Sequence, residues 1–488
     1  MNCRQTRRLL SVQREWTEEE RSAVQKHLAG CPACQAVARE YELMDRRLGR
    51  LPEPLPATAL WPAIRARTIT AGMAPASQPA SRLRWAFQGM VLIALIALLT
   101  FLALGWRAGL MPTAGPSPST GPWASGASAG ATATIPLPTP QGMTETRTII
   151  YGIQVQMMLD QEPAPVIEAV HDLGFGWVKQ QVRWADIEPQ PGEFRWDVLD
   201  RTVASLDDAG VHLLLNVVGS PRWAWPQGAS YEVMGPPADP ADFAAFMGAL
   251  AARYRGRIGA YEIWQEQNID YAWGGRVDVE EYMALLQKAS QAIRSADPDA
   301  LVLSGGLTPT GAPPPHAMDD ARYLAAMYRL GLKTYADAVG VHLPTYNLPP
   351  DADWRTFQDP SAHFRGFEQF RHRSWSFRGT AEAYREVMEA NNAADHPLWV
   401  TEFGWAVSDD PPRYWEHAGD NTPQEQAEFT LRALAMAEKW DWVEAMFLWN
   451  LNFAVVAPDS KEAMWSIVGP DWERTETFEA LTQSTQRR

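Results

Sequence analysis

Short apolar runs alternate with amphipathic segments over the last two thirds of the chain. Eight of these runs are six to eight residues long and rich in β-branched, aromatic and aliphatic side chains, which is typical of buried strands. They cover residues 149–155, 177–184, 211–218, 260–266, 300–306, 338–343, 398–403 and 445–451. The pattern therefore predicts eight strands.

The segments between these strands carry signals for helix starts. One helix is predicted from Asp278, which has a glutamate three residues later, to about Ser295. Another is predicted from Thr422, which is followed by a proline and then by Glu425. After Asp239, large apolar residues recur on one face of a 3.6-residue period, which indicates a third helix.

Strand and helix alternate eight times over about 340 residues, which is the arrangement of a (β/α)8 TIM barrel with a parallel sheet. We predict that residues 148–488 form this α/β fold. A doubly wound open sheet is the alternative with the same alternation. Because no glycine-rich phosphate loop follows the first predicted strand, a dinucleotide-binding fold has no support.

Residues 87–106 contain no charged side chain, and a helix of this length can cross a ~30 Å hydrocarbon layer. Arginines are concentrated before it, at positions 65, 67, 82 and 84, whereas only Arg107 follows before Arg147. We predict a transmembrane helix over 85–107 with its N-terminal side in the cytoplasm, because positive charge favours the inner face.

Two segments beside the predicted span have compositions that disfavour a packed core. Residues 49–84 are rich in proline and alanine and are predicted to form a juxtamembrane linker. Residues 108–147 are rich in proline, serine, threonine, alanine and glycine, which predicts an extended stalk. Two ordered domains remain, a small one over 1–48 in the cytoplasm and a large one over 148–488 outside the cell.

Composition and charge narrow the function classes. The formal net charge of −15 at pH 7 argues against nucleic acid as a direct partner. All three cysteines lie in the first 34 residues, so disulfides cannot hold the large domain together. The predicted barrel has no group of His, Asp and Glu with metal-binding spacing and no legible Ser-His-Asp set, so no cofactor is expected for it.

Two glutamates mark the ends of predicted barrel strands, Glu266 the fourth and Glu402 the seventh. In a barrel these strand ends meet at one face, where function is concentrated. A glycosidase needs two carboxyl groups there, one to protonate the leaving oxygen and one to attack or to activate water. Either glutamate alone would be an ordinary strand-end residue, but the pair favours glycoside hydrolysis.

The motifs around these glutamates resemble those of the retaining glycoside hydrolases of clan A, the cellulase-like and β-xylosidase-like barrels. Residues 262–268, EIWQEQN, are similar to the family pattern EIWNEPN, and residues 399–405, WVTEFGW, carry the nucleophile motif. The resemblance implies that Glu266 is the acid/base and Glu402 the nucleophile, acting on an oligosaccharide or polysaccharide. We expect their carboxyl groups ~5–5.5 Å apart, as in retaining enzymes.

The resemblance and the tryptophans indicate which side chains contact the sugar. The family has arginine where this chain has Lys179, although Arg183 shares that strand face, and asparagine where this chain has Gln265. Flat indole faces can stack on a pyranose ring. The expected substrate-binding residues are Lys179, Arg183, Trp223, Gln265, His342, Tyr346, Trp405 and Trp449.

The N-terminal region contains a metal-ligand pattern. His27, Cys31 and Cys34 follow the spacing His-x3-Cys-x2-Cys, and Cys3 completes a set of four ligands. Nitrogen and sulfur ligands suit tetrahedral zinc, and a reducing cytoplasm keeps thiols available. We therefore predict a structural zinc site in a small helical domain over residues 1–48, with a capping-box helix that carries the histidine.

This head resembles the zinc-containing anti-sigma domain of bacterial transmembrane regulators, which implies a single-pass bacterial membrane protein with a sigma-factor partner. Its Cys-x2-Cys pair also makes a redox-responsive head a candidate. Two functions follow. The first is a membrane-anchored extracellular retaining glycoside hydrolase with a cytoplasmic regulatory head, which the pair of glutamates favours. The second is a transmembrane anti-sigma regulator whose barrel senses carbohydrate without turnover.

Overall fold

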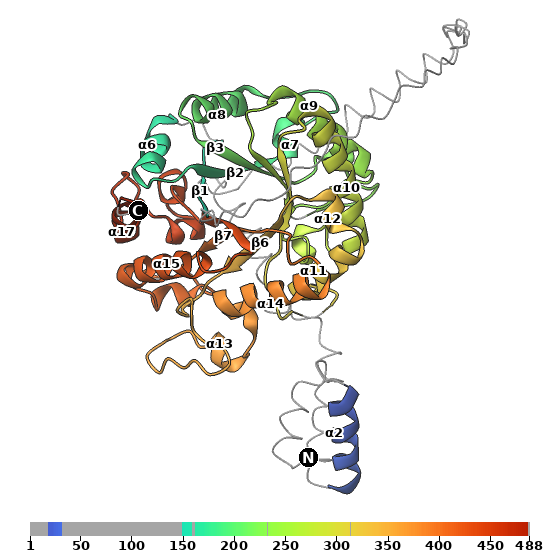
Figure 1. Cartoon of the computed structure of the whole chain (residues 1–488), viewed down its shortest axis with the longest axis vertical. Helices are drawn as coiled ribbons and strands as arrows, with labels where there is room; N and C mark the ends of the chain where they lie inside the picture. Colours follow the sequence, from blue (N-terminus) through green and yellow to red (C-terminus); the bar gives the residue numbers. More distant parts are fainter. Residues whose placement is uncertain (1–17, 32–148, 159–161, 232, 313, 487–488) are drawn as a thin grey trace, which may run out of the picture. The chain divides into compact units, whose positions relative to one another are not determined.

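The computed structural model of this chain describes residues 18–31, 149–158, 162–231, 233–312 and 314–486. From residue 149 onward the described residues form a closed barrel of parallel strands with helices around it (Figure 1). The strands are β1 Ile150–Val155, β2 Trp177–Arg183, β3 His212–Val218, β4 Ala260–Gln265, β5 Leu301–Gly306, β6 Val339–Pro344, β7 Leu398–Gly404 and β8 Val443–Leu448.

The sheet closes on itself. Strand β1 pairs in parallel with both β2 and β8, and the order runs β5-β4-β3-β2-β1-β8-β7-β6. Parallel bridges from Leu303 to Ala338 and from Leu307 to Val341 join β5 to β6 and complete the circle. The predicted eight-stranded α/β barrel is confirmed, and the open-sheet alternative is wrong.

Helices follow the strands on the outside of the barrel (Figure 1). The longer ones are α6 Ala164–Asp172, α8 Asp197–Asp208, α9 Pro240–Arg253, α10 Val279–Ala296, α11 Asp320–Arg329, α14 Phe377–Ala390, α15 Pro423–Ala437 and α17 Glu476–Thr485. Short α-helical turns are α7 Trp184–Ile187, α12 Leu332–Tyr335, α13 Gly366–Gln369 and α16 Phe453–Val456. The 3-10 turns are η2 Arg222–Ala224, η3 Asp270–Ala272, η4 Arg373–Trp375, η5 Glu416–Gly419 and η6 Lys461–Trp465.

The predicted helix starts are confirmed by their caps. The Asp278 side chain accepts a hydrogen bond from the backbone N–H of Glu281 at the start of α10. Thr422 and Glu425 form both hydrogen bonds of a capping box before α15. Each such cap satisfies backbone N–H groups that the first helical turn leaves unpaired, worth about 1 kcal/mol.

Seven strands begin and end within one residue of the prediction, and the eighth does not. Strand β8 begins at Val443, which pairs with Leu398, and ends at Leu448 rather than at Leu451. After Leu448 the chain leaves the sheet, and Trp449 lines a pocket instead of continuing the strand. The predicted strand ran on to Leu451 because the walls of pockets and buried strands are built from the same apolar residue types.

The barrel interior is packed with side chains. One buried cluster inside it comprises Leu214, Ala260, Leu303, Ala338, Trp399, Ala445 and Phe447. Trp399 and Phe447 stack with ring centroids 5.9 Å apart. A Cβ on Gly152 would lie 2.4 Å from the Phe447 ring, so only glycine fits there. The core fills the barrel and leaves the carboxyl ends of the strands for function.

In the N-terminal region the structure describes one helix, α2, over Glu18–Gly30. The predicted linker, membrane helix and stalk, residues 49–84, 85–107 and 108–147, lie outside the described residues and stay predictions. Among the residues that are described, none of the helices combines the length and the hydropathy that crossing a bilayer requires.

Candidate active site

Strand β4 delivers Glu266 to the mouth of the barrel through an unusual backbone. Trp264 and Glu266 have positive φ angles of 69° and 53°, a region that costs residues with a Cβ roughly 1–2 kcal/mol. The backbone N–H of Glu266 donates to the Gly306 carbonyl oxygen at 2.7 Å. The Tyr271 hydroxyl donates to its Oε2. Glu266 is thereby held, 6% exposed, in a fixed position.

Strand β7 aims Glu402 into the same space. The β6–β7 and β7–β8 pairings both shift register near the ends of these strands. Such irregularities break the alternation of inward and outward side chains. As a result both Thr401 and Glu402 have partners inside the barrel: the Thr401 hydroxyl donates to Glu262 Oε1 at 2.8 Å, and Glu402 Oε1 lies 3.0 Å from Lys179 Nζ.

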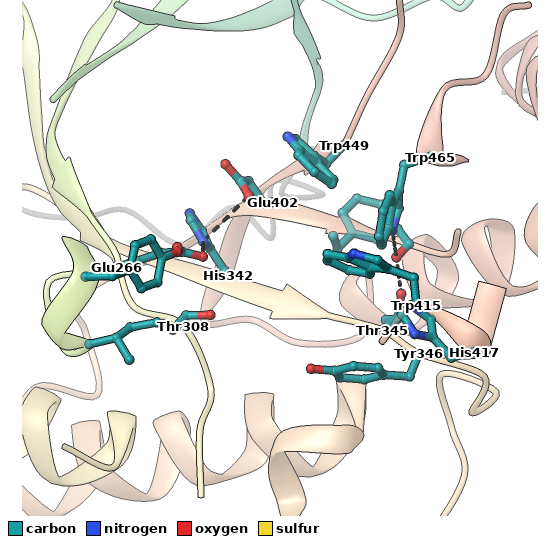
Figure 2. A pocket seen from close by; sticks show the side chains of 14 residues that line it. Glu266, Thr308, His342, Thr345, Tyr346, Glu402, Trp415, His417, Trp449 and Trp465 are labelled. Atoms are coloured by element: carbon teal, nitrogen blue, oxygen red, sulfur yellow. Dashed lines mark hydrogen bonds and ion pairs between the residues drawn. The ribbon is translucent and has the colours of Figure 1, made fainter. Parts of the chain in front are cut away.

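His342 lies between the two glutamates. Its Nδ1 is 3.5 Å from Glu266 Oε1 and 3.6 Å from Glu402 Oε2 (Figure 2). The imidazole reaches this place because residue 306 is glycine, where a Cβ would lie 2.4 Å from the ring. The structure therefore brings together the three residues that the sequence placed after strands four, six and seven.

The position of His342 limits how far apart the carboxyl groups are. Since both oxygens lie within 3.6 Å of one nitrogen, they are separated by less than twice that distance. Retaining glycosidases have a separation of ~5–5.5 Å and inverting ones ~6.5–9.5 Å. The two carboxyl groups therefore share one site, and the retaining separation stays a prediction.

Glu402 belongs to a cluster of three charged side chains, together with Lys179 and Glu262. Lys179 Nζ lies 3.0 Å from Glu402 Oε1 and 3.1 Å from Glu262 Oε2, and it donates to the Thr401 carbonyl oxygen at 3.3 Å. Burial by itself would lower the pKa of Lys179, but the two carboxylates outweigh it and hold that pKa above its ordinary value. Lys179 is therefore a charged ammonium paired with both Glu402 and Glu262.

Lys179, predicted as a substrate contact, lies among buried partners. The side chain is 0% exposed and is not part of the pocket lining. Its whole hydrogen-bonding capacity is used by Glu262, Thr401 and Glu402. Lys179 is a positioning residue for Glu402.

A second network joins Glu402 to a tryptophan. With its amide nitrogen turned toward Glu402, Gln154 donates to Glu402 Oε1 at 3.3 Å and accepts from the Trp449 indole N–H at 3.3 Å. Gln154 is buried on β1, so it can hold both partners in place. Trp449, predicted as a sugar contact, therefore stands over the barrel mouth beside Glu402 (Figure 2).

A pocket with about 800 Å³ of empty space, open to solvent, contains both glutamates. Its lining is Glu266, Ile269, Tyr271, Thr308, His342, Thr345, Tyr346, Glu402, Phe403, Gly404, Trp415, His417, Trp449 and Trp465. Burial, reinforced by the charge of Glu266, raises the pKa of Tyr346 to about 12, so its phenol stays protonated as a hydrogen-bond donor. A concave site with aromatic walls and a few convergent polar groups is typical of small-ligand binding.

Besides Lys179, four other predicted substrate contacts lie outside this lining. Arg183 is solvent-exposed at the end of β2. Trp223 packs edge-on against Trp184, and Trp405 is 1% exposed in the main core with its N–H donated to a backbone carbonyl. Gln265 is buried, and its amide oxygen has no hydrogen-bond partner among the described residues. For Trp223 and Trp405 the indole completes the core, which spacing in the sequence does not distinguish from a sugar platform.

Sequence reasoning missed several residues of the site. Glu262 is an inward-facing carboxylate four residues before Glu266 in an otherwise apolar strand, and that charge was a usable signal. Tyr271, Trp415 and His417 come from loops after β4 and β7. The path of a loop is not encoded in a short periodic pattern, so no signal identified these three.

Two of the four predicted zinc ligands are described. His27 lies in the last turn of α2, and Cys31 follows the helix directly, four residues later, with its backbone N–H bonded to the Leu28 carbonyl oxygen at 3.4 Å. Cys3 and Cys34 lie outside the described residues. The donor set of three thiols and one imidazole fits zinc, and the complete site stays a prediction.

Comparison with known proteins supports the fold. The family model for glycoside hydrolase 42, described as beta-galactosidase, matches residues 161–232. A family 39 glycoside hydrolase from the gut symbiont Bacteroides cellulosilyticus WH2 has a similar structure, with a TM-score of 0.54 and 18% sequence identity. The similarity covers 71% of this chain and 65% of that one, so the chain spans less than two thirds of that enzyme. The barrel is glycoside hydrolase-like.

Two further solved structures give lower scores. Xylanase 10B from Thermotoga petrophila RKU-1, in complex with xylobiose, gives a TM-score of 0.47 at 12% identity, covering 70% of this chain and 95% of that one. A beta-galactosidase from the psychrophilic Marinomonas ef1 gives 0.45 at 13% identity, covering 69% and 59%. No curated protein matches the chain.

Proposed function

We propose that the barrel is a retaining glycoside hydrolase with Glu402 as nucleophile and Glu266 as acid/base. The observation that carries this proposal is the pair of carboxylates held in one pocket, both within 3.6 Å of His342 Nδ1. The two environments differ as the two roles require. Glu402 is paired with the buried Lys179 ammonium, whereas Glu266 accepts a hydrogen bond from the Tyr271 hydroxyl.

In the first step Glu402 attacks the anomeric carbon while Glu266 gives its proton to the glycosidic oxygen. The bond from carbon to leaving oxygen breaks, and a covalent glycosyl ester forms on Glu402. In the second step Glu266, now a carboxylate, takes a proton from water, which attacks the same carbon and frees Glu402. When Glu402 loses its charge in the ester, Glu262 still balances Lys179, so the buried lysine is never unpaired.

The substrate class is an oligosaccharide or polysaccharide. Trp449 presents an indole next to the nucleophile, where an apolar sugar face can stack. The match of residues 161–232 to the beta-galactosidase model makes aryl β-galactosides the first compounds to test.

Replacing Glu266 by glutamine tests the acid/base role through the leaving group. Without a proton donor, departure of a poor leaving group becomes difficult, whereas an activated aryl leaving group needs little protonation. We expect kcat/KM for unactivated alkyl glycosides to fall at least about a hundredfold, and far more than for dinitrophenyl glycosides. The latter should show a burst, because breakdown of the ester is now slow. Equal losses for both substrate types would contradict the assignment.

We further propose that residues 1–48 form a cytoplasmic zinc-binding head, that residues 85–107 anchor the chain in a bacterial membrane with the barrel outside, and that the head binds a sigma factor. The ligand spacing of Cys3, His27, Cys31 and Cys34 supports the zinc site, and the uncharged segment supports the anchor. Zinc would supply folding free energy to a domain too small for a large core.

Metal analysis of the full chain tests the head. We expect about one zinc per chain, because four nitrogen and sulfur ligands form one tetrahedral site. Cys31→Ser combined with Cys34→Ser should remove it without changing glycosidase activity. His171→Gln, at an exposed histidine of the barrel, serves as the control and should leave the zinc content unchanged. Zinc that survives the double replacement would refute the predicted ligand set.

A sensor without turnover is the second candidate. It is favoured by Gln265, which replaces the family asparagine and lies outside the pocket lining. In a sensor the barrel binds oligosaccharide, and Glu266→Gln changes neither affinity nor any rate. A measurable rate for wild-type chain on any glycoside, lost in the variant, would exclude it.

A further inference from the structure

The wall of the pocket opposite Glu266 contains a buried histidine with an unusual environment. His417 lies in η5, in the loop after β7, and is 1% exposed. Its ring packs against aromatic neighbours, with centroids 4.9 Å from Tyr346, 5.6 Å from Trp415 and 6.1 Å from Trp465. The loops after β7 and β8 supply this aromatic wall, which forms a small cluster separate from the main core.

Neither ring nitrogen of His417 has a hydrogen-bond partner among the described residues. The carboxylate that acts on it electrostatically, Asp420, is already used by other groups: it accepts from Asn347, from the His363 ring and from two backbone N–H groups. Burial lowers the pKa of His417 to about 3, so the ring is neutral, with one N–H donor and one acceptor. Two buried ring nitrogens without hydrogen-bond partners destabilise the fold, and packing of the aromatic side chains alone does not explain why a histidine is present.

The position of this wall defines which part of a ligand it meets. Figure 2 shows Glu266 at one side of the pocket and Trp415, Trp465 and His417 at the other, with Glu402 and Trp449 between them. The acid protonates the leaving oxygen, so the departing group lies on the Glu266 side. The sugar that bonds to Glu402 therefore extends toward the aromatic wall. A hydroxyl both donates and accepts, which matches a neutral imidazole.

We propose that His417 is a specificity-determining residue that hydrogen-bonds a hydroxyl of the sugar transferred to Glu402. This inference rests on the proposed function and adds the residue that selects the sugar. The ring is covered by aromatic side chains and not by hydrogen-bonded partners, so a hydroxyl can replace a ring contact without breaking a hydrogen bond. Discrimination follows because an epimer, whose hydroxyl at that carbon points the other way, leaves the imidazole unpaired.

The test is His417→Phe in the full chain, assayed with four 4-nitrophenyl β-glycosides: galactoside, glucoside, mannoside and xyloside. Each of the other three differs from the glucoside at a single position, the galactoside at C4, the mannoside at C2 and the xyloside by the missing C5 hydroxymethyl group, so each comparison with the glucoside reports on one position. We expect the kcat/KM preference of the wild-type chain among them to shrink about tenfold or more in the variant. Phenylalanine keeps the ring and removes two unpaired polar atoms, so the melting temperature should stay constant or rise.

His396→Phe is the matched control. His396 is also buried, but it lies outside the pocket lining and both of its nitrogens are within hydrogen-bond distance of partners, the Tyr328 hydroxyl at 3.2 Å and the Ala336 carbonyl oxygen at 3.1 Å. Its replacement should lower the melting temperature and leave the preference among glycosides unchanged. A changed preference in His417→Phe alone supports the proposal, and an unchanged preference overturns it, whatever the melting temperature does.

Failure of the proposed function gives a different result. If the wild-type chain hydrolyses none of the four compounds, binding of galactose, glucose, mannose and xylose is measured by tryptophan fluorescence, since Trp415 and Trp465 lie beside His417. Loss of sugar selectivity in His417→Phe then supports the role of His417 without catalysis. Unchanged selectivity, or no binding of any sugar by the wild-type chain, overturns it.

Discussion

Replacing Glu402 by glutamine should abolish turnover of every glycoside that the full chain hydrolyses. The amide has the size of the carboxylate but carries no charge with which to attack the anomeric carbon, so the covalent step is lost. We expect kcat to fall at least about a thousandfold, equivalent to about 4 kcal/mol of transition-state stabilisation. The loss should be similar for activated and unactivated leaving groups, because neither kind of leaving group departs without attack by Glu402.

A smaller replacement sharpens this prediction. Glu402→Ala opens space for azide, which should restore turnover of an activated aryl β-glycoside and give the α-glycosyl azide, the product of a single displacement. Glu428→Gln on α15 makes the same chemical change at an exposed site outside the pocket and should leave kcat unaltered. Residual activity in Glu402→Gln above one hundredth of the wild-type value would remove Glu402 from the nucleophile role.

Replacing Lys179 by methionine should both destabilise the barrel and slow the reaction. It leaves Glu262, a fully buried carboxylate, without its counter-charge, and removing one partner of a buried ion pair typically costs about 3–5 kcal/mol. It also leaves Glu402 without the ammonium that holds its side chain in position, so kcat/KM should fall. Chemical denaturation and steady-state kinetics measure the two effects.

Two comparisons separate positioning from packing at Lys179. Lys179→Arg keeps the charge and should retain most activity. Lys333→Met removes a lysine from an exposed pair with Asp395, and its stability should change by less than about 1 kcal/mol. If Lys179→Met is no less stable than Lys333→Met, the buried cluster does not carry the energy assigned to it.

The fold was predictable because strand spacing and helix caps are local. Asp278 and Thr422 cap helices in the structure as their sequence contexts indicated, since a cap involves residues only two or three positions apart. The predicted bounds of strand β8 were shifted toward the C-terminus, because Trp449 lines the pocket and yet continues an apolar run in the sequence.

The site was predictable only where a strand end fixes it. Glu266, His342 and Glu402 come together because three neighbouring regions of the barrel end at one rim. Lys179 was assigned to the sugar, whereas its partner Glu262 lies 83 positions later and holds it in the interior. That pairing depends on the register between β2, β3 and β4, which a local sequence pattern does not determine. The paths of the loops that bring His417 to the pocket are equally non-local.

The left-handed backbone at Glu266 has an evolutionary consequence. Glycine adopts a φ of 53° without the penalty of about 1 kcal/mol that a Cβ brings, and one nucleotide change converts a glutamate codon to a glycine codon. That single change would relieve the backbone cost and would also remove the carboxyl group from the pocket. Glutamate at a position where the polypeptide alone would favour glycine therefore supports a function of the side chain itself.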